Sequence, residues 1–529
     1  MAKKQTKAAK ELRLEDILMK CRNLLRGKMG LSNKRDMLLT LTFLKFTEEK
    51  FEAKRREIIA DFEKQNINPD EEFAKQSLEN PAWYGEAFYL PEDCRYSYLI
   101  NKVEQKKLAL AIDDAVANLQ RMYPQLDGAL PSKLFVDSRI EGKDLKAVMD
   151  EMNKIDHKRF TEKDLIGHVY EYFLQAFAVS MKDDKEEGEF YTPESIVELI
   201  AALIEPLDGS VYDPCCGSGG MFVQSVKFVD AHGGNTKAVQ VYGQESNPET
   251  YRLARMNLAV RGISNNLGGR NASTFTNDLH KDLKVDYIMA NPPFNLKNWR
   301  ADKELTDDVR WAGYDTPPVS NANYAWILHI INKLKPKKGI AGFLLANGAL
   351  GDDDTVNIRS KLIENDKVEA IIVLPRNMFY STDISVTLWI VNQNKEAHTW
   401  HGRKLRDRRG EILFMDLRTW DSNIYEKKYV QFSPEQIAKV VDVYHRWQSP
   451  DCDSASFAEP EYYRSVGIEE IAQNGWSLVP SRYIEFVDRD KDLDYHSIIA
   501  EKQQEITALL TEQKNEIDKL EKALKAING

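Results

Sequence analysis

The sequence predicts a Rossmann-like, doubly wound α/β domain with an all-α domain before it and a coiled-coil-like helix after it. Beyond Gly209, short β-branched runs alternate with helical stretches, a pattern typical of a parallel sheet covered by helices. Before about Leu165, apolar residues recur at three- and four-residue spacing, and this spacing returns from Ile499 onward. The predicted segments are an all-α domain over residues 1–165, the α/β domain over 166–445, a linker or long surface loop over 446–490, and a C-terminal helix over 491–529.

The composition is that of a folded protein without membrane segments. The 529 residues are 42% hydrophobic and 29% charged, and the mean hydropathy is −0.51. No apolar run approaches the roughly 18 residues of a spanning helix, and five scattered cysteines fit a reducing cytoplasm. The formal net charge of −10 predicts that any contact with nucleic acid is local or shared with a partner. The histidines lack metal-binding spacing and no CxxC pair occurs, so we predict no metal site.

The predicted elements of the α/β domain alternate along the chain. Candidate strands cover residues 210–213, 238–243, 285–290, 339–346, 368–374 and 385–391, and candidate helices cover 220–231, 248–261, 323–334 and 356–365. Ligands of a doubly wound sheet bind beyond the carboxyl ends of its strands. Motifs that directly follow a strand are therefore the candidate site residues.

The C-terminal region is predicted from composition and spacing. Residues 448–464 are rich in Ser, Pro and Asp, which is typical of a linker or a long surface loop. From Ile499, Ile and Leu recur with Glu and Lys between them, as in a coiled coil. Such a helix either docks on a partner helix or packs back on its own domain.

A glycine-rich turn, Asp213-Pro-Cys-Cys-Gly-Ser-Gly-Gly220, follows the first predicted strand. Glycines let the backbone approach a ligand at a helix N-terminus, but the spacing differs from the phosphate-binding G-x-G-x-x-G turn. The carboxylate of Asp213 suits an ammonium group, and Glu245 ends the second strand, where acids commonly bind ribose hydroxyls. A nucleoside with an amino-acid cation meets both conditions, so we predict S-adenosylmethionine as the cofactor.

The motif Asn291-Pro-Pro-Phe294 follows the apolar strand that ends at Ala290. An exocyclic amine on a purine is a poor nucleophile because its lone pair is delocalised into the ring. The amide oxygen of Asn291 and the carbonyl of Pro292 can accept its two N–H groups, which favours direct transfer of a methyl group. Pro293 keeps the chain extended, and Phe294 offers a ring face to a base taken out of the duplex.

Two further segments allow more than one interpretation. Phe190-Tyr-Thr-Pro193 is an aromatic turn that opens a helix, with Thr192 as N-cap and Pro193 at the first helical position, a role compatible with cofactor contact. The segment 401–410 has five basic residues between two strand candidates. It either contacts DNA phosphates or forms a solvated hairpin tip.

In order, the motifs Gly188-Glu-Phe-Tyr-Thr-Pro193, Asp213 to Gly220, Glu245, Asp278 and Asn291 to Phe294 resemble those of adenine-N6 DNA methyltransferases of the type I restriction-modification class. The resemblance is to the modification (M) subunit and covers nearly the whole chain. It implies an S-adenosylmethionine-dependent methyltransferase fold for the α/β domain. It also implies that the catalytic residues are Asn291, Pro292, Pro293 and Phe294, and that the cofactor-binding residues are Glu189, Phe190, Tyr191, Thr192, Pro193, Glu194, Asp213, Gly217, Ser218, Gly219, Gly220, Glu245 and Asp278.

Within this set, the resemblance assigns 189–194 to the methionine end of the cofactor, 218–220 to the turn, Glu245 to the ribose and Asp278 to the adenine. Cys215 and Cys216 stand where the family commonly has small residues such as Ala. This departure loosens the assignment of individual contacts in the turn and leaves the acids and the Asn-Pro-Pro-Phe motif in place.

The resemblance also implies partners and a location. An M subunit modifies double-stranded DNA whose target adenine is flipped out, in the prokaryotic cytoplasm. A separate specificity subunit reads the bases, with two M subunits per specificity subunit, and a restriction nuclease or translocase subunit can join them. No extra target-recognition domain follows Asn291 in this chain, and the C-terminal helix is the expected docking element.

Several alternative activities remain open at this point. A solitary adenine-N6 DNA methyltransferase, or an enzyme that methylates glutamine N5 in proteins, would use the same crevice. Phe294 in place of the usual Tyr and the large helical domain disfavour the protein substrate. N4-cytosine methylation would need the same two acceptors. Cytosine-C5 methylation at Pro214-Cys215 would leave the Asn-Pro-Pro-Phe motif without a role.

Overall fold

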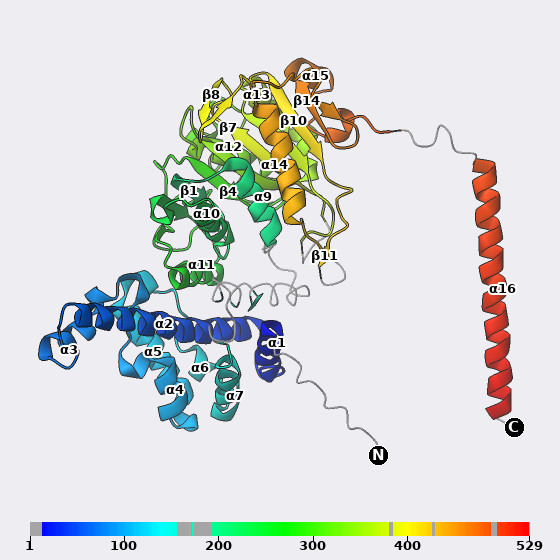
Figure 1. Cartoon of the computed structure of the whole chain (residues 1–529). Coiled ribbons are helices and arrows are strands. Elements are labelled where there is room, and N and C mark those ends of the chain that lie inside the picture. Colours follow the sequence, from blue (N-terminus) through cyan, green and yellow to red (C-terminus); the bar gives the residue numbers. More distant parts are fainter. Residues whose placement is uncertain are drawn as a thin grey trace.

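The computed structural model describes residues 13–155, 165, 169, 172–173, 192–379, 384–425, 429–487 and 495–527. Its N-terminal part is helical (Figure 1). The α-helices are α1 (Leu14–Leu24), α2 (Leu31–Lys64), α3 (Glu72–Leu78), α4 (Tyr96–Lys102), α5 (Leu108–Met122), α6 (Leu134–Asp137) and α7 (Gly142–Met152). Short 3-10 turns connect them: η1 (Pro81–Trp83), η2 (Gly85–Ala87), η3 (Glu92–Cys94), η4 (Gln105–Lys107) and η5 (Pro124–Leu126).

Helix α2 forms the centre of this helical part. Residues 36–47 are buried on every side, and the two charged residues among them form ion pairs, Asp36 with Arg35 and Lys45 with Glu49. The hydroxyls of Thr40 and Thr42 donate to the carbonyls of Asp36 and Leu38, so these buried polar groups are satisfied within the helix. The predicted all-α architecture before the sheet is therefore confirmed.

The second part is built on a mixed sheet. Its strands within the described residues are ordered β13-β14-β10-β6-β7-β5-β4-β1-β2-β3. Their bounds are β1 (Gly209–Asp213), β2 (Val239–Gly243), β3 (Asn265–Asn266), β4 (Tyr287–Ala290), β5 (Ile340–Ala346), β6 (Val368–Val373), β7 (Val386–Asn392), β10 (Glu411–Asp416), β13 (Ala458–Glu459) and β14 (Tyr463–Gly467). Strands β7 and β14 run antiparallel to their neighbours. Two small hairpins lie outside the sheet: β8 (His398–Trp400) with β9 (Arg403–Leu405), and β11 (Ile424–Tyr425) with β12 (Tyr429–Val430).

Helices cover both faces of the sheet, as a doubly wound fold requires. One face packs against α9 (Glu194–Ile204), α10 (Gly220–Ala231), α11 (Pro248–Arg261) and α14 (Pro434–Gln448), and the other against α12 (Asn323–Lys333), α13 (Val356–Glu364) and α15 (Ile468–Gln473). Successive residues of β5 alternate between these two cores: Leu344 belongs to the first, and Phe343 and Leu345 belong to the second. All seven residues of β5 are buried, which is typical of a central strand.

Helix α11 joins the two parts of the chain. Its residues Leu253, Met256 and Val260 belong to the hydrophobic core of the helical part. The guanidinium of Arg255 donates to the carbonyls of η5, including Gln125 at 3.0 Å. Figure 1 shows α2 running beneath α11. The helical part thus packs directly on an element of the sheet domain.

The predicted strands and helices of the α/β domain are confirmed to within two residues, but the predicted linker is wrong. Residues 446–490 include β13, β14, α15 and η11 (Pro480–Arg482), and β14 pairs with β10 along its whole length. The Ser-, Pro- and Asp-rich composition belongs to the turn after α14. The strand that follows, Tyr-Arg-Ser-Val-Gly, is stabilised by pairing with a distant strand, which local composition does not reveal.

The C-terminal helix α16 (Tyr495–Ile527) is also confirmed, and it stands apart from the rest of the chain in Figure 1. All its described side chains are exposed, including the apolar Ile506, Leu510, Ile517 and Leu520 at 48–62% exposure. Of the two open interpretations, packing back on its own domain is not observed. Among the described helices, none is both long and apolar enough to cross a bilayer.

Candidate active site

The candidate site lies where three parallel strands end side by side. Strand β1 pairs with β2 so that Asp213 lies opposite Gly243, and it pairs with β4 so that Tyr212 lies opposite Ile288. Glu245 follows β2 by two residues, and Asn291 directly follows β4. The two acids and the amide therefore share one edge of the sheet, as the sequence predicts.

The glycine-rich turn is held from both sides. The amide of Cys216 donates to the carbonyl of Gln244 at 3.0 Å, and the side chain of Asn257 on α11 donates to the carbonyl of Ser218 at 2.8 Å. Gly217 and Gly219 have φ angles of 54° and 82°, which only glycine adopts without strain. Gly219 then caps α10, so the N-terminus of that helix faces the crevice.

Asp213 is a buried carboxyl group at the end of β1. Its side-chain oxygen Oδ1 accepts from the backbone N–H of Cys215 at 3.0 Å, and the residue is only 2% exposed. Burial, with the neighbouring charge of Glu245, raises the pKa of Asp213 to about 7. Within the described residues no Lys or Arg forms an ion pair with it. The group is suited to pair with a cation supplied by a ligand.

Glu245 closes the turn. Its Oε2 accepts from the N–H of Gly217 at 3.0 Å, and its Oε1 accepts from the N–H of Asn247 at 2.8 Å. The same carboxylate thus ties the end of β2 to the turn after β1. Both oxygens have further lone pairs, so ribose contact at Glu245 stays a prediction that this geometry allows.

Asp278 has structural partners that the sequence does not indicate. Its Oδ1 accepts from the N–H of His280 at 2.9 Å, and its Oδ2 pairs at 2.7 Å with Lys333 on α12, whose side chain is 1% exposed. Burial lowers the pKa of Lys333, while Asp278 opposes that shift. A contact between Asp278 and the adenine of a cofactor stays a prediction.

The Asn-Pro-Pro-Phe motif contains an acceptor without a donor. The side-chain atom Oδ1 of Asn291 is buried, and no described group donates to it. The amide nitrogen Nδ2 donates to the hydroxyl of Thr192 at 2.9 Å. Phe294 meets Phe379 edge to face, with ring centroids 5.9 Å apart. A buried acceptor that lacks a donor among the described residues is costly, and a ligand N–H would satisfy it.

The residues before α9 are only partly described. Glu189, Phe190 and Tyr191 lie outside the described residues. The expected N-cap role of Thr192 is wrong: α9 begins at Glu194, Pro193 is the capping position, and no side chain caps it. Thr192 uses its hydroxyl for Asn291 instead, because it lies one residue too early to reach the free N–H groups of the helix.

Glu194 contacts the helix that follows the turn. Its Oε1 accepts from Gln224 at 2.7 Å and from Lys227 at 3.1 Å, and both donors lie on α10. Its side chain is 38% exposed. A cofactor contact at Glu194 stays a prediction.

The sequence interpretation missed Arg310 in η8 (Val309–Trp311). This arginine is 7% exposed and donates to the carbonyls of Thr274 and Phe275 at 2.9 and 2.7 Å. The hydroxyl of Thr274 in turn donates to the carbonyl of Pro214 in the glycine-rich turn. Arg310 therefore links the segment after Asn-Pro-Pro-Phe to the backbone of the turn. A single arginine in a charged loop carries no sequence signal for such a role.

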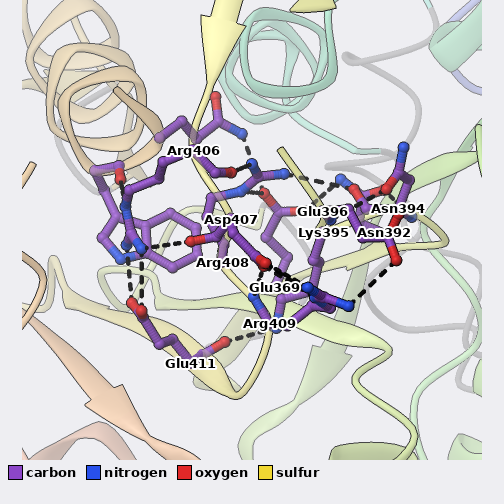
Figure 2. Close-up of polar contacts among 12 residues, drawn as sticks. Glu369, Asn392, Asn394, Lys395, Glu396, Arg406, Asp407, Arg408, Arg409 and Glu411 are labelled. Carbon is purple, nitrogen blue, oxygen red and sulfur yellow. Dashed lines mark hydrogen bonds and ion pairs between the residues drawn. The ribbon is translucent and has the colours of Figure 1, made fainter. Parts of the chain in front are cut away.

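Within the basic segment, Arg406 and Arg408 pair with acids of the same chain and are half-buried and buried, whereas Arg409 is exposed. Contact of the segment with DNA phosphates stays a prediction. Figure 2 shows Arg406, Arg408 and Arg409 directed at carboxylates. Arg408 donates to Glu369 at 3.1 Å with both side chains fully buried, Arg406 donates to Glu411 at 2.8 and 3.0 Å, and Arg409 pairs with Asp407 and Glu396. Asn392 and Gln448 also donate to Glu369. The contacts of Arg406 and Arg408 therefore hold this segment, which follows the β8–β9 hairpin, against β10 and β6.

The Pro214-Cys215 pair is unsuited to nucleophilic catalysis. Desolvation, with the negative charges of Asp213 and Glu245, raises the pKa of the Cys215 thiol well above its ordinary value. A catalytic cysteine needs a lowered pKa, because the thiolate is the nucleophile. This disfavours the cytosine-C5 alternative.

Comparison with known proteins extends over both parts of the chain. The family model described as N-6 DNA Methylase matches residues 161–492, and the model described as HsdM N-terminal domain matches residues 14–152. The type I restriction enzyme HindI methylase subunit of Haemophilus influenzae is 43% identical over 369 residues, which cover 69% of this chain and 77% of the relative. The type I restriction enzyme MjaIX methylase subunit of Methanocaldococcus jannaschii is 32% identical over 525 residues, which cover 97% and 91%. A solved type I restriction-modification methyltransferase subunit from Streptococcus thermophilus has a TM-score of 0.70 at 22% identity, with 89% and 98% coverage.

Proposed function

The chain belongs to the N-6 DNA methylase family, among the methylase subunits of type I restriction enzymes, and is an adenine-specific DNA methyltransferase. On this premise we propose that it methylates N6 of an adenine in double-stranded DNA with S-adenosylmethionine as methyl donor, at sites chosen by a separate specificity subunit. The observation that carries the proposal is the buried Oδ1 of Asn291 at the end of β4, which has no donor in the part of the chain that the structure describes.

The proposed catalytic step uses two acceptors and one ring. Asn291 Oδ1 accepts one N–H of the target amine, and the carbonyl of Pro292 accepts the other. The two bonds would turn the lone pair of the nitrogen away from the purine ring and toward the methyl carbon of the donor. The bond from that carbon to sulfur would break with its electron pair left on sulfur, and the nitrogen would lose one proton. Phe294, held edge-on by Phe379, offers its face to the flipped base. Pro292 is buried, while Asn291 and Phe294 beside it are half-buried.

The described residues fit the proposed cofactor. Asp213 has a raised pKa and no cationic partner among the described residues, so it suits the ammonium group of a methionine moiety. The turn at Gly217 to Gly220 and the carboxylate of Glu245 offer backbone and acceptor groups to the nucleoside. When bound, S-adenosylmethionine supplies an activated methyl group on its sulfonium. Glu189 to Glu194 and Asp278 complete the proposed binding residues.

The proposed partner surface is helix α16. Its Ile and Leu side chains are exposed along one long helix, which is the form that a partner helix recognises. We propose that α16 docks on the specificity subunit, with two methylase chains per specificity subunit, as the sequence resemblance implies. A nuclease or translocase subunit can join this assembly, as the sequence resemblance implies.

The test is transfer of label from radiolabelled S-adenosylmethionine to unmethylated host DNA, with and without the specificity subunit. Label in N6-methyladenine only with that subunit supports the proposal. Label without it indicates a solitary enzyme, and label in protein glutamine indicates the N5-glutamine alternative. No label in DNA under either condition contradicts the proposal. Asn291→Ala is the control, because it removes the first acceptor and leaves the cofactor turn intact.

A further inference from the structure

Among the described residues, the side-chain amide of Asn291 has one hydrogen-bond partner. Nδ2 donates to the hydroxyl of Thr192 at 2.9 Å, while Oδ1 is buried without a described donor. The side-chain amide of Asn rotates over a broad range when nothing holds it. The direction of Oδ1 therefore depends on a residue that lies 99 positions earlier in the chain.

Thr192 is itself placed by a well-anchored helix start. Two residues further on, Glu194 bonds to Gln224 and Lys227 on α10. Ser195 accepts from the backbone N–H of Phe432 at 3.2 Å, which ties the start of α9 to the segment between β12 and α14. Most residues of α9 are buried against the sheet. The Thr192 hydroxyl is thus presented to Asn291 from the segment that directly precedes this anchored helix.

A hydroxyl is the appropriate partner for this position. It accepts from Nδ2 and so leaves Oδ1 available to accept from a ligand N–H. A side chain of the same shape without a polar atom would leave Nδ2 unpaired, and the amide would then turn away to find another partner. The two acceptors for the target amine would no longer be held at a fixed separation.

We propose that Thr192 is a positioning residue for methyl transfer: its hydroxyl holds the amide of Asn291 so that Oδ1 meets the target N–H. This inference rests on the proposed function and deepens it. It differs from the cofactor contact implied for Thr192 by resemblance. A cofactor contact would act on the affinity for S-adenosylmethionine, whereas a positioning role acts on the rate of transfer at saturating cofactor.

The experiment compares Thr192→Val, Thr192→Ser and wild type in the full complex with the specificity subunit. Thr192→Val is expected to lower kcat about 10- to 100-fold, the effect of a small misplacement of a reacting group, with the dissociation constant for S-adenosylmethionine within about 3-fold of wild type. Thr192→Ser keeps the hydroxyl and is expected to restore most of kcat. Thr399→Val, on the exposed β8 hairpin, is the matched control and should leave kcat unchanged.

A second measurement reports on Asn291 itself. Wild-type complex should bind DNA with adenine at the target more tightly than DNA with purine there, because purine lacks the exocyclic amine. Thr192→Val should reduce this discrimination while binding of the purine DNA stays constant. If Thr192 had a merely structural role, Thr192→Val would weaken the binding of both DNAs equally.

Each outcome decides between explanations. An unchanged kcat in Thr192→Val, a rise only in the Michaelis constant for the cofactor, or failure of Thr192→Ser to recover activity would overturn the positioning role. If the wild-type complex itself produces no N6-methyladenine, the proposed function fails and the inference falls with it. If wild type is active and Thr192→Val equals it, only the inference fails.

Discussion

Asp213 is expected to lower the stability of the ligand-free protein in a pH-dependent way. Its pKa of about 7, raised by burial and by Glu245, lies far above the ordinary value of 3.8. The folded state therefore holds this proton more tightly than the unfolded state, and stability is lost as pH rises from about 4 to 7. One pKa unit corresponds to about 1.4 kcal/mol, so the penalty is roughly 2 kcal/mol at pH 5 and roughly 4 kcal/mol at pH 8.

Asp213→Asn removes this titration. The unpaired Nδ2 of the new amide adds a cost of about 1–3 kcal/mol that does not depend on pH. The free energy of unfolding of the variant, relative to wild type, should therefore rise by roughly 2 kcal/mol between pH 5 and pH 8 and then level off. The assay is urea denaturation followed by tryptophan fluorescence, without cofactor. The variant should also lose the stabilisation that S-adenosylmethionine gives to wild type, because the ligand cation has lost its partner.

Asp286→Asn is the matched control at the opposite end of the sheet. Burial alone would raise the pKa of Asp286, but the hydrogen bonds from Lys335, Lys338 and Ser210 outweigh burial and hold it well below the ordinary value. This variant should be destabilised by a constant amount from pH 5 to pH 8. A flat difference between Asp213→Asn and wild type over the same range would refute the reasoning about Asp213.

Three further predictions concern residues outside the predicted motifs. The lysine side chain in Arg310→Lys cannot bridge the carbonyls of Thr274 and Phe275, so the Michaelis constant for S-adenosylmethionine should rise about 10-fold while kcat at saturation stays nearly unchanged. A lower kcat at saturation would contradict the view that Arg310 acts by supporting the glycine-rich turn. Arg408→Met leaves Glu369 as a buried, unpaired charge and should cost about 3–5 kcal/mol in denaturation experiments, whereas combining it with Glu369→Leu should recover most of that loss. Truncation after Asp490 removes α16 and should abolish co-purification with the specificity subunit, while the melting temperature of the remainder stays unchanged; retained assembly would count against α16 as the docking helix.

The sequence alone predicts an element correctly where the local residue pattern agrees with the environment of that element in the folded protein. The six predicted strands and four predicted helices lie within two residues of their observed bounds, since buried parallel strands are continuous apolar runs and the helices between them carry clear boundaries. Helix α11 begins at a Pro after the capping Asn247 and ends at Arg261, before the C-capping Gly262. The convergence of Asp213, Glu245 and Asn291 followed from the rule that parallel strands end at one edge.

The features that the sequence did not predict depend on contacts between distant parts of the chain. Lys333 neutralises Asp278 from a helix 55 residues later, and nothing in the local sequence of either residue indicates that pairing. The five basic residues of 401–410 suggested solvent or phosphate, but the partner acids of Arg408 and Arg406 come from β6 and β10. Composition counts charges without showing whether the fold brings an opposite charge to each of them.

Helix α11 contacts both the helical part and the sheet domain, and this limits how two related proteins can be combined into one hybrid chain. Its apolar residues Leu253, Met256 and Val260 complete one core, while Asn257 on the same helix holds the carbonyl of Ser218. A cut between the helical part and the sheet would open a hydrophobic surface on the same element that supports the glycine-rich turn. A hybrid of two related proteins therefore keeps both cores intact only when the helical part and the α11 surface are inherited from the same parent.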